Sequence, residues 1–214
     1  LKGITFEIFP GEMVGMIGLN GAGKSTTLKH ILGLMQPYQG EIRLKGRRLQ
    51  DSPQAYRATY AYVPETPLLY EELTVREHME LTAMAYGLSK SVFESRLEPL
   101  LREFQMKERL QVLAGHLSKG MKQKLMLINA FLVDPELYLI DEPFLGLDPL
   151  GIRSLLELMV RRKRQGSTIL VSSHILSTIE AYCDRMIIID RGKLAAVGNL
   201  QQLRQSIGSE TASL

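Results

Sequence analysis

The chain has 214 residues, of which 45% are hydrophobic and 23% are charged. This composition is typical of a globular protein and excludes an intrinsically disordered, collagen-like or coiled-coil chain. The formal net charge of +3 is too small to indicate a nucleic-acid partner. The single cysteine, Cys183, excludes an intrachain disulfide and suits a reducing compartment.

The sequence contains no uninterrupted apolar stretch of the roughly 18 residues that a membrane-spanning helix needs, and no signal-peptide pattern opens it. If this protein serves a membrane, another chain must therefore cross that membrane. The first residue, Leu1, belongs to a stretch that reads like the middle of a sheet, so we expect a further segment to precede it.

The first part of the chain predicts strands, a glycine-rich loop and a helix. Residues 4–9 alternate as a half-buried strand does, and residues 13–17 predict a short buried strand that leads into the loop. From residue 25 to residue 34 the apolar pattern becomes helical. Further short strands are predicted within residues 40–49 and 59–65.

Between residues 66 and 128 the strand patterns disappear and helical patterns replace them. Thr74 and Glu77 have the spacing of a capping box, in which each side chain satisfies a free backbone N–H, so a helix is predicted to begin there. Further helices are predicted over residues 89–104 and 118–133. We therefore expect an inserted helical subdomain.

Strands and helices alternate again in the last part of the chain. The patterns predict a strand at 137–141, a helix at 149–164, a strand at 167–173, and a final pair of strands at 185–190 and 193–198. Apolar strands that alternate with helices predict a parallel sheet that is covered on both faces.

Residues 18–25 read GLNGAGKS and fit the pattern G-x-x-x-x-G-K-[ST] between a predicted strand and a predicted helix. Small residues let consecutive backbone N–H groups close around phosphate oxygens, and the positive end of the following helix favours the anion. Lys24 would reach the β- and γ-phosphates, and Ser25 would ligate Mg²⁺; a glycine-rich turn without a ligand is the alternative. The expected phosphate contacts are Asn20, Gly21, Ala22, Gly23, Lys24, Ser25 and Thr26.

The predicted strand LYLID delivers two acidic residues at its end, Asp141 and Glu142. Ligands of open α/β sheets lie beyond the carboxyl ends of the strands, so Asp141 is expected to hold the Mg²⁺ shell. Glu142 is then placed to orient or deprotonate the water that attacks the γ-phosphate. The alternative for Glu142 is a solvated acid at a strand end.

The predicted fold is a single α/β domain over residues 1–214, with the core of a phosphate-loop nucleoside triphosphatase. Its sheet is expected to be mainly parallel, with an antiparallel β element near the N-terminus. Residues 1–65 and 129–214 would form the nucleotide-binding core, and residues 66–128 would form the helical subdomain.

Motifs in the second half of the chain resemble those of the ATP-binding subunits of ABC (ATP-binding cassette) transporters. Residues 117–124, LSKGMKQK, are similar to the signature LSGGQ of that family, and GLDP at 146–149 is similar to its D-loop around Asp148. His174, directly behind an apolar strand, matches the switch histidine. The resemblance covers essentially the whole chain, and PETPLLYEELT at 64–74 resembles the subunit of bacterial Ecs-type transporters.

This resemblance implies an ATPase that works as a head-to-tail homodimer with ATP and Mg²⁺ sandwiched at the interface. Ser118 and Gly120 of one subunit would meet the γ-phosphate held by Lys24 of the other, with Asp148 at the same interface and His174 as a catalytic residue. Hydrolysis would power transport through a separate transmembrane permease subunit, which residues 70–73 would help to receive. The subunit would then lie on the cytoplasmic face of a bacterial membrane, with no nucleic-acid partner.

The sequence departs from the family pattern at two motif positions. Glu65 stands where the family usually has glutamine; a carboxylate can also ligate Mg²⁺, so we expect a functional Glu65 near the metal and nucleotide, with a solvated acid as the alternative. Lys119 stands at the first signature glycine, where we favour a side chain that points into solvent over one that attracts phosphate. The aromatic residue that stacks on adenine is expected upstream of Leu1.

Two other functions stay open from the sequence. A cassette ATPase that acts on DNA or ribosomes would usually carry tandem cassettes or coiled-coil insertions, and the sequence shows neither. A regulatory module that closes on ATP with little turnover is suggested by Glu65 and Lys119, whereas Glu142 and His174 oppose it.

Overall fold

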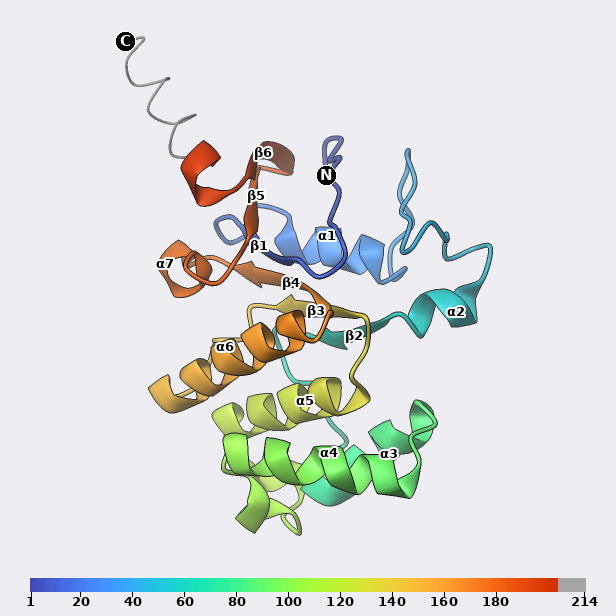
Figure 1. Ribbon diagram of the computed structural model, residues 1–214, viewed down its shortest axis with the longest axis vertical. Coiled ribbons are helices and arrows are strands. Elements are labelled where there is room, and N and C mark those ends of the chain that lie inside the picture. Colours follow the sequence, from blue (N-terminus) through green and yellow to red (C-terminus); the bar gives the residue numbers. More distant parts are fainter. Residues whose placement is uncertain (204–214) are drawn as a thin grey trace.

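The structure, a computed structural model, describes residues 1–203 and is built around a six-stranded sheet with the order β2-β3-β4-β1-β5-β6 (Figure 1). Neighbouring strands pair in parallel as far as β5, and β5 and β6 pair antiparallel. The strands are β1 (Met13–Ile17), β2 (Tyr60–Val63), β3 (Leu137–Asp141), β4 (Thr168–Ser173), β5 (Arg185–Asp190) and β6 (Lys193–Gly198).

Helices cover both faces of this sheet (Figure 1). Helix α1 lies on one face, α6 and α5 lie on the other, and α3 and α4 pack against the far side of α5. The α-helices are α1 (Lys24–Ile31), α2 (Pro53–Arg57), α3 (Val75–Ala85), α4 (Lys90–Glu103), α5 (Lys119–Val133), α6 (Pro149–Arg164) and α7 (Leu176–Ile179), with 3-10 turns at Lys107–Arg109 and Ala114–His116.

Strands β1, β3 and β4 are apolar on both sides because each face of this part of the sheet is buried against helices. Val14, Met16 and Leu139 belong to the cluster on the α1 face, whereas Tyr138 and Ile140 belong to the larger cluster under α5 and α6. A strand that is buried on both faces reads as a continuous apolar run, which is the pattern seen in the sequence.

The predicted helix starts are confirmed by their caps. Thr74 and Glu77 form the predicted capping box: the Glu77 N–H donates to Thr74 Oγ1 at 3.2 Å, and the Thr74 N–H donates to Glu77 Oε2 at 2.7 Å. Ser89, Ser118 and Asp148 accept from backbone N–H groups in the first turns of α4, α5 and α6. Each such cap contributes about 1 kcal/mol to helix stability.

The strands predicted at residues 4–9 and 40–49 do not form. Ile4, Phe6 and Ile8 are half-buried against the cluster on the α1 face, while their neighbours in the sequence are exposed. The alternating pattern therefore arises because one side of this segment is buried, although within the described residues its backbone forms no hydrogen bonds to a neighbouring strand. Residues 40–49 contain only an isolated bridge between Leu44 and Arg47. The antiparallel pairing expected near the N-terminus lies instead at β5 and β6.

The short helices α2 and α7 were not predicted, because few residues in them carry a periodic apolar pattern. Helix α5 continues through residue 128, which is the predicted boundary between the nucleotide-binding core and the helical subdomain. The division of the chain into these two parts stays a prediction. The part of the predicted core at residues 204–214 lies outside the described residues.

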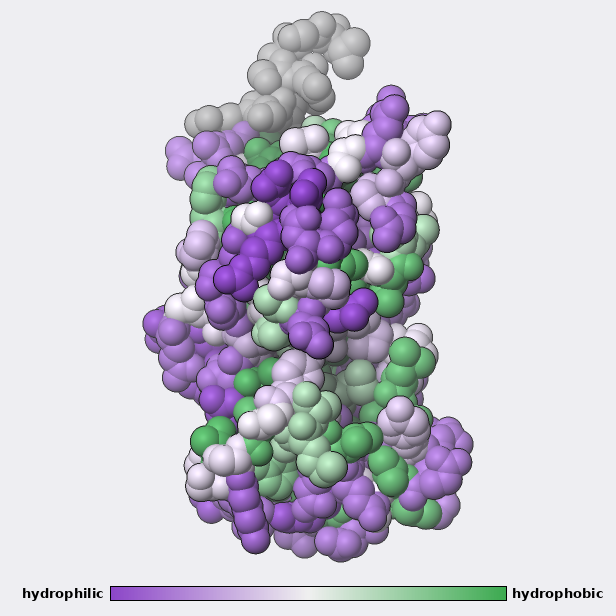
Figure 2. Space-filling view, turned by 90° about the vertical axis from the view of Figure 1, so that its right-hand side faces the viewer, coloured by the Kyte–Doolittle hydropathy of each residue, from purple (hydrophilic) through white to green (hydrophobic). Residues whose placement is uncertain are grey.

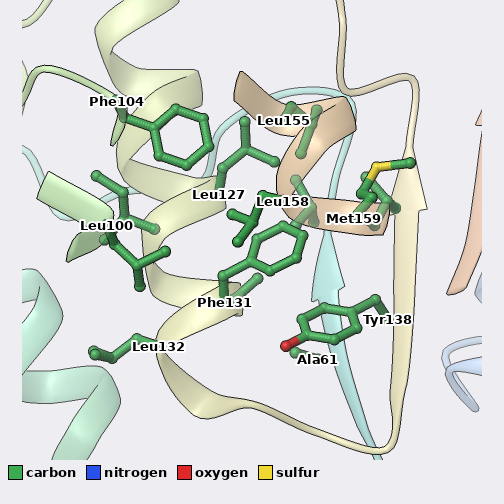
Figure 3. Packing of buried hydrophobic residues seen from close by; sticks show 14 of the residues in the cluster. Ala61, Leu100, Phe104, Leu127, Phe131, Leu132, Tyr138, Leu155, Leu158 and Met159 are labelled. Carbon is green, nitrogen blue, oxygen red and sulfur yellow. The ribbon is translucent and has the colours of Figure 1, made fainter. Parts of the chain in front are cut away.

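The core under α5 and α6 contains an aromatic stack (Figure 3). The rings of Phe131 and Tyr138 lie 4.5 Å apart between centroids at an interplanar angle of 23°, so α5 packs directly on β3. Both side chains are fully buried. Burial raises the pKa of the Tyr138 phenol, so that it stays protonated and donates to Asp134 at 3.4 Å.

We expect Phe131→Ala to lower the free energy of unfolding by about 3–5 kcal/mol, because it removes a buried ring and leaves a cavity against Tyr138. Urea unfolding followed by far-UV circular dichroism measures the change. Tyr38→Ala is the control: Tyr38 is 98% exposed, so its loss should change stability by less than about 0.5 kcal/mol. Equal effects of the two variants would contradict this account of the core.

Candidate active site

The parallel register brings segments that are distant in the sequence to one edge of the sheet. Ile17 lies opposite Ser173, and Asp141 lies opposite Ser172, so β1, β3 and β4 end side by side. The residues that follow these strands therefore meet beyond the carboxyl edge, where open α/β sheets bind their ligands. The glycine loop, Glu142 and His174 are those residues.

The glycine loop is held close to the end of β5. A Cβ atom at Gly18 would lie 2.4 Å from the carbonyl oxygen of Ile189, so no larger residue fits without backbone movement. The loop ends at Gly23, whose φ of 113° is one that L-residues rarely adopt. The N–H groups of Lys24, Ser25 and Thr26 donate to no acceptor within residues 1–203, as expected for the first turn of a helix. The loop therefore offers free donors and a positive helix end to an anion.

Lys24 points back into the loop and is buried, with 5% of its side chain exposed. Its Nζ donates to the carbonyl oxygen of Gly18 at 2.7 Å and lies 3.1 Å from Oε1 of Glu142. A buried ammonium needs such partners because burial without them is costly. The lysine of the phosphate loop thus lies beside the acid predicted to be catalytic.

Glu142 is the centre of the site. Its φ of 44° is uncommon for a residue other than glycine, and such outliers are concentrated at functional sites. Nδ1 of His174 lies 2.8 Å from Oε2 of Glu142, and because a carboxylate can only accept, the ring donates. The 3.1 Å contact of Oε1 with Lys24 lacks hydrogen-bond alignment, and this oxygen accepts no hydrogen bond within the described chain. Oε1 can therefore accept from a further donor.

Asp141 is held by a residue that the sequence analysis missed. Ser172, fully buried on β4, donates from Oγ to Oδ1 of Asp141 at 2.5 Å and accepts the Glu142 N–H at 3.0 Å. One hydroxyl thus positions both acids. No motif in the sequence marks Ser172, because its role arises from its register opposite Asp141.

Glu65 is exposed just beyond β2, at the rim of the same edge. Burial raises the pKa of the Tyr62 phenol to about 12, and the negative charges of Asp141 and Glu65 add to this rise. Both carboxylates therefore lie within electrostatic reach of one side chain. Val63 on β2 pairs with Ile140 on β3, and β4 lies on the other side of β3, so Glu65 follows a strand end that is beside the end of β3 and on the far side from His174.

Ser118, Gly120 and Asp148 form a separate group, which no described contact joins to Lys24. Ser118 is exposed at the start of α5, and Asp148 is exposed at the start of α6. A Cβ at Gly120 would lie 2.4 Å from the carbonyl oxygen of Gly146, so the two helix starts are in close contact with each other. Lys119 is also exposed.

The residues present fit a nucleotide-bound Mg²⁺ rather than a metal caged by protein alone. No group of three or more histidine, cysteine, aspartate or glutamate side chains in residues 1–203 is arranged to hold a metal ion. Mg²⁺ is usually bound through one or two carboxylates together with substrate phosphates and water. The carboxylate of Asp141 and the half-buried Ser25 hydroxyl at the loop are ligand types that such a site uses.

Comparison with known proteins agrees with this geometry. The family model described as ABC transporter matches residues 1–145. The ABC-type transporter ATP-binding protein EcsA of Bacillus subtilis (strain 168) is 56% identical over 214 residues, which are 100% of this chain and 87% of that protein. The chain belongs to the ABC transporter family. The predicted resemblance to Ecs-type subunits is confirmed.

Solved structures of the family share the fold. One titled "Structure of ATP binding subunit of ABC transporter" has a TM-score of 0.93 and 57% identity, and the match covers 97% of this chain and 87% of that chain. The cbiO1 protein of Clostridium perfringens, described as part of the ABC transporter complex cbiONQ, has a TM-score of 0.80 and 25% identity over 96% of this chain and 84% of its own. This chain is an ATP-binding subunit of the ABC family, whose ATP-binding subunits are ATPases.

Across residues 1–203, the structure has no helix that is both long enough and apolar enough to cross a bilayer.

We expect Ser172→Ala to lower the free energy of unfolding by about 1–3 kcal/mol, because it leaves the buried Asp141 carboxylate without its hydroxyl donor. Urea unfolding at neutral pH measures the loss. Ser154→Ala is the matched control: Ser154 is also buried, but it donates to the neutral carbonyl oxygen of Glu103 at 3.2 Å, so its loss should be smaller. A loss for Ser172→Ala no larger than that of the control would contradict the role given to Ser172.

Proposed function

We propose that this chain hydrolyses Mg-ATP at the edge of its sheet and thereby powers transport through a separate transmembrane subunit. The observation that carries the proposal is the series Lys24, Glu142 and His174, in which the buried Glu142 carboxylate contacts both the buried Lys24 and the half-buried His174. A module that binds ATP without turnover has no need of a carboxylate oxygen that lies beside the phosphate-binding lysine and accepts no hydrogen bond within the described residues. Activation of water for phosphoryl transfer does need one.

In this proposal the loop binds the phosphates of ATP. The Lys24 ammonium and the free N–H groups at the start of α1 contact the β- and γ-phosphate oxygens. Ser25 and Asp141 would hold Mg²⁺, and Glu65 would supply a further carboxylate near them. When bound, Mg²⁺ neutralises the charge that the phosphate oxygens develop.

Glu142 then acts on the attacking water. Oε1 of Glu142 accepts a proton from the water while the oxygen of the water bonds to the γ-phosphorus. The bond between that phosphorus and ADP breaks, and phosphate is released. His174 holds the other carboxylate oxygen through its ring and its backbone N–H, at 2.8 and 3.3 Å, and so keeps Glu142 oriented. His174 therefore works through Glu142.

A second copy of the chain completes the site. Ser118 and Gly120 lie at a further helix N-terminus, which in a head-to-tail homodimer would meet the phosphates bound by the loop of the other copy. Apolar side chains flank the predicted interface: Leu150, beside Asp148, is 51% exposed, and Ile175, next to His174, is 47% exposed. These exposures support an interface that closes over ATP.

The surface of the helical region supports a membrane partner. Hydrophobic side chains gather in the lower half of Figure 2, over the segment around α3 and α4. Leu68, Tyr70 and Met84 are between 64% and 76% exposed, and the Tyr70 N–H donates to Nε2 of His78 at 2.9 Å, which fixes this loop on α3. An exposed apolar surface of this kind marks an interaction site. We assign it to the permease subunit, which holds the protein at the cytoplasmic face of a bacterial membrane.

Glu142→Gln is expected to lower the steady-state rate of Mg-ATP hydrolysis by roughly 10²–10⁴-fold, because the amide cannot accept the proton of the water. Binding of a fluorescent ATP analogue should persist. Phosphate release over a range of protein concentrations measures the rate, and Glu157→Gln, an exposed acid on α6, is the matched control. Equal hydrolysis by Glu142→Gln and wild type would remove Glu142 from the mechanism.

Met84→Glu should weaken association with the cognate permease by about tenfold or more, because it places a charge in the apolar surface. Co-purification of the complex from membranes measures this, and the hydrolysis rate of the isolated subunit should not change. Leu34→Glu carries the same new charge at a residue that is 69% exposed after α1. If both variants release the permease equally, the surface has been assigned wrongly.

A further inference from the structure

Helix α5 carries a buried glutamine that the mechanism described above does not use. Gln123 is 1% exposed, and its Nε2 donates to the carbonyl oxygen of Pro143 at 3.3 Å. Its Oε1 is also buried and accepts no hydrogen bond within the described part of the chain. A buried amide that is only half satisfied is costly, so an apolar residue at this position would be expected to stabilise the core better. The one bond that it makes goes to the residue next to Glu142.

The neighbouring residue on α5 holds the other end of the same loop. Nζ of Lys124 lies 2.9 Å from Oδ2 of Asp148, while Oδ1 of Asp148 accepts the N–H of Gly151 at 2.6 Å. The Lys124 ammonium, together with that N–H, holds the pKa of Asp148 below its usual range. Residues 143–148 are therefore fixed to α5 at both ends.

Between these ends, α5 lies against the backbone of the loop. Gly120 approaches Gly146 so closely that a Cβ would stand 2.4 Å from the Gly146 carbonyl oxygen. The aliphatic part of the Lys119 side chain also packs on Gly146, since a Cβ atom at Gly146 would lie 3.5 Å from Cγ of Lys119. The first two turns of α5 and the loop thus form one packed unit.

We propose that Gln123 is a positioning residue for Glu142. By holding the Pro143 carbonyl, it fixes the Pro143–Phe144 peptide, the second peptide after Glu142, and so restrains the left-handed backbone that places the carboxylate beside Lys24. Because Ser118 caps the helix that carries Gln123, any displacement of the start of α5 is transmitted to Glu142 of the same chain. This inference rests on the proposed function, in which Glu142 activates water.

A purely structural role for Gln123 makes different predictions from a positioning role. If Gln123 only fills the core, replacing it with methionine, which has a similar volume and no polar atoms, should leave turnover unchanged. If it positions Glu142, the same change should lower kcat by about tenfold with little effect on KM for ATP, since small displacements of a catalytic group slow the chemical step. The loss should also vanish when Glu142 is already replaced.

The test compares Gln123→Met, Glu142→Gln and the double variant in steady-state hydrolysis, with equilibrium binding of a fluorescent ATP analogue. We expect Gln123→Met to lose about tenfold in kcat, to bind the analogue within twofold of wild type, and to cause no further loss in the Glu142→Gln background. Asn129→Leu is the matched control, since Asn129 is an amide on the same helix whose buried oxygen accepts no hydrogen bond from residues 1–203 and which has no described contact with the loop. It should keep the wild-type kcat.

Amide hydrogen exchange of the whole chain provides a readout that does not depend on activity. Gln123→Met should raise the exchange rate of residues 144–147 by about tenfold while β3 keeps its protection. Unchanged exchange in this loop, unchanged kcat, or an equal further loss in the double variant would overturn the role of Gln123. If Glu142→Gln hydrolysed ATP at the wild-type rate, the proposed function would be overturned instead. The hydrogen-exchange result would still decide whether Gln123 holds the loop.

Discussion

The parallel register of β1, β3 and β4 is the constraint on which the rest of the active site depends. Ser172 and Ser173 on β4 lie opposite Asp141 on one side and Ile17 on the other, so the strand ends are level. The phosphate loop and Glu142 emerge there beside each other, although they are far apart in the sequence. A shift of one residue in the pairing of β3 with β4 would move Asp141 and Ser172 to opposite faces of the sheet and so separate the hydroxyl from the carboxylate.

Charges buried at this edge are tolerated because each one has partners. Lys24 contacts two carbonyl oxygens as well as Glu142, and Glu142 contacts Lys24, His174 and the Ser172 hydroxyl through its N–H. A buried ion pair of this kind contributes little net stability, since desolvation offsets its attraction. Its retention in the core is better explained by the geometry that it imposes on the residues proposed to act on ATP.

Helix α5 connects the parts of the molecule. Its apolar side packs Phe131 on Tyr138 of β3, and its last turn is fixed by arginines: Arg96 donates to the carbonyl oxygens of Leu132 and Val133, and Arg162 donates to that of Phe131. Its first turns lie on the loop that follows Glu142. The helix is therefore held firmly on the sheet, and its exposed start carries the signature residues. Coupling between those residues and Glu142 would need this arrangement.

The sequence by itself determined the buried strands, the capped helices and the phosphate loop, because each depends on residues that are neighbours in the chain. The alternation at Ile4, Phe6 and Ile8 predicted burial correctly but not a strand, since a strand also needs a hydrogen-bonded partner. Only the tertiary structure decided the roles of Ser172 and Gln123. Their partners, Asp141 and Pro143, lie 31 and 20 positions away and reach them through strand register and helix packing, which no local pattern records.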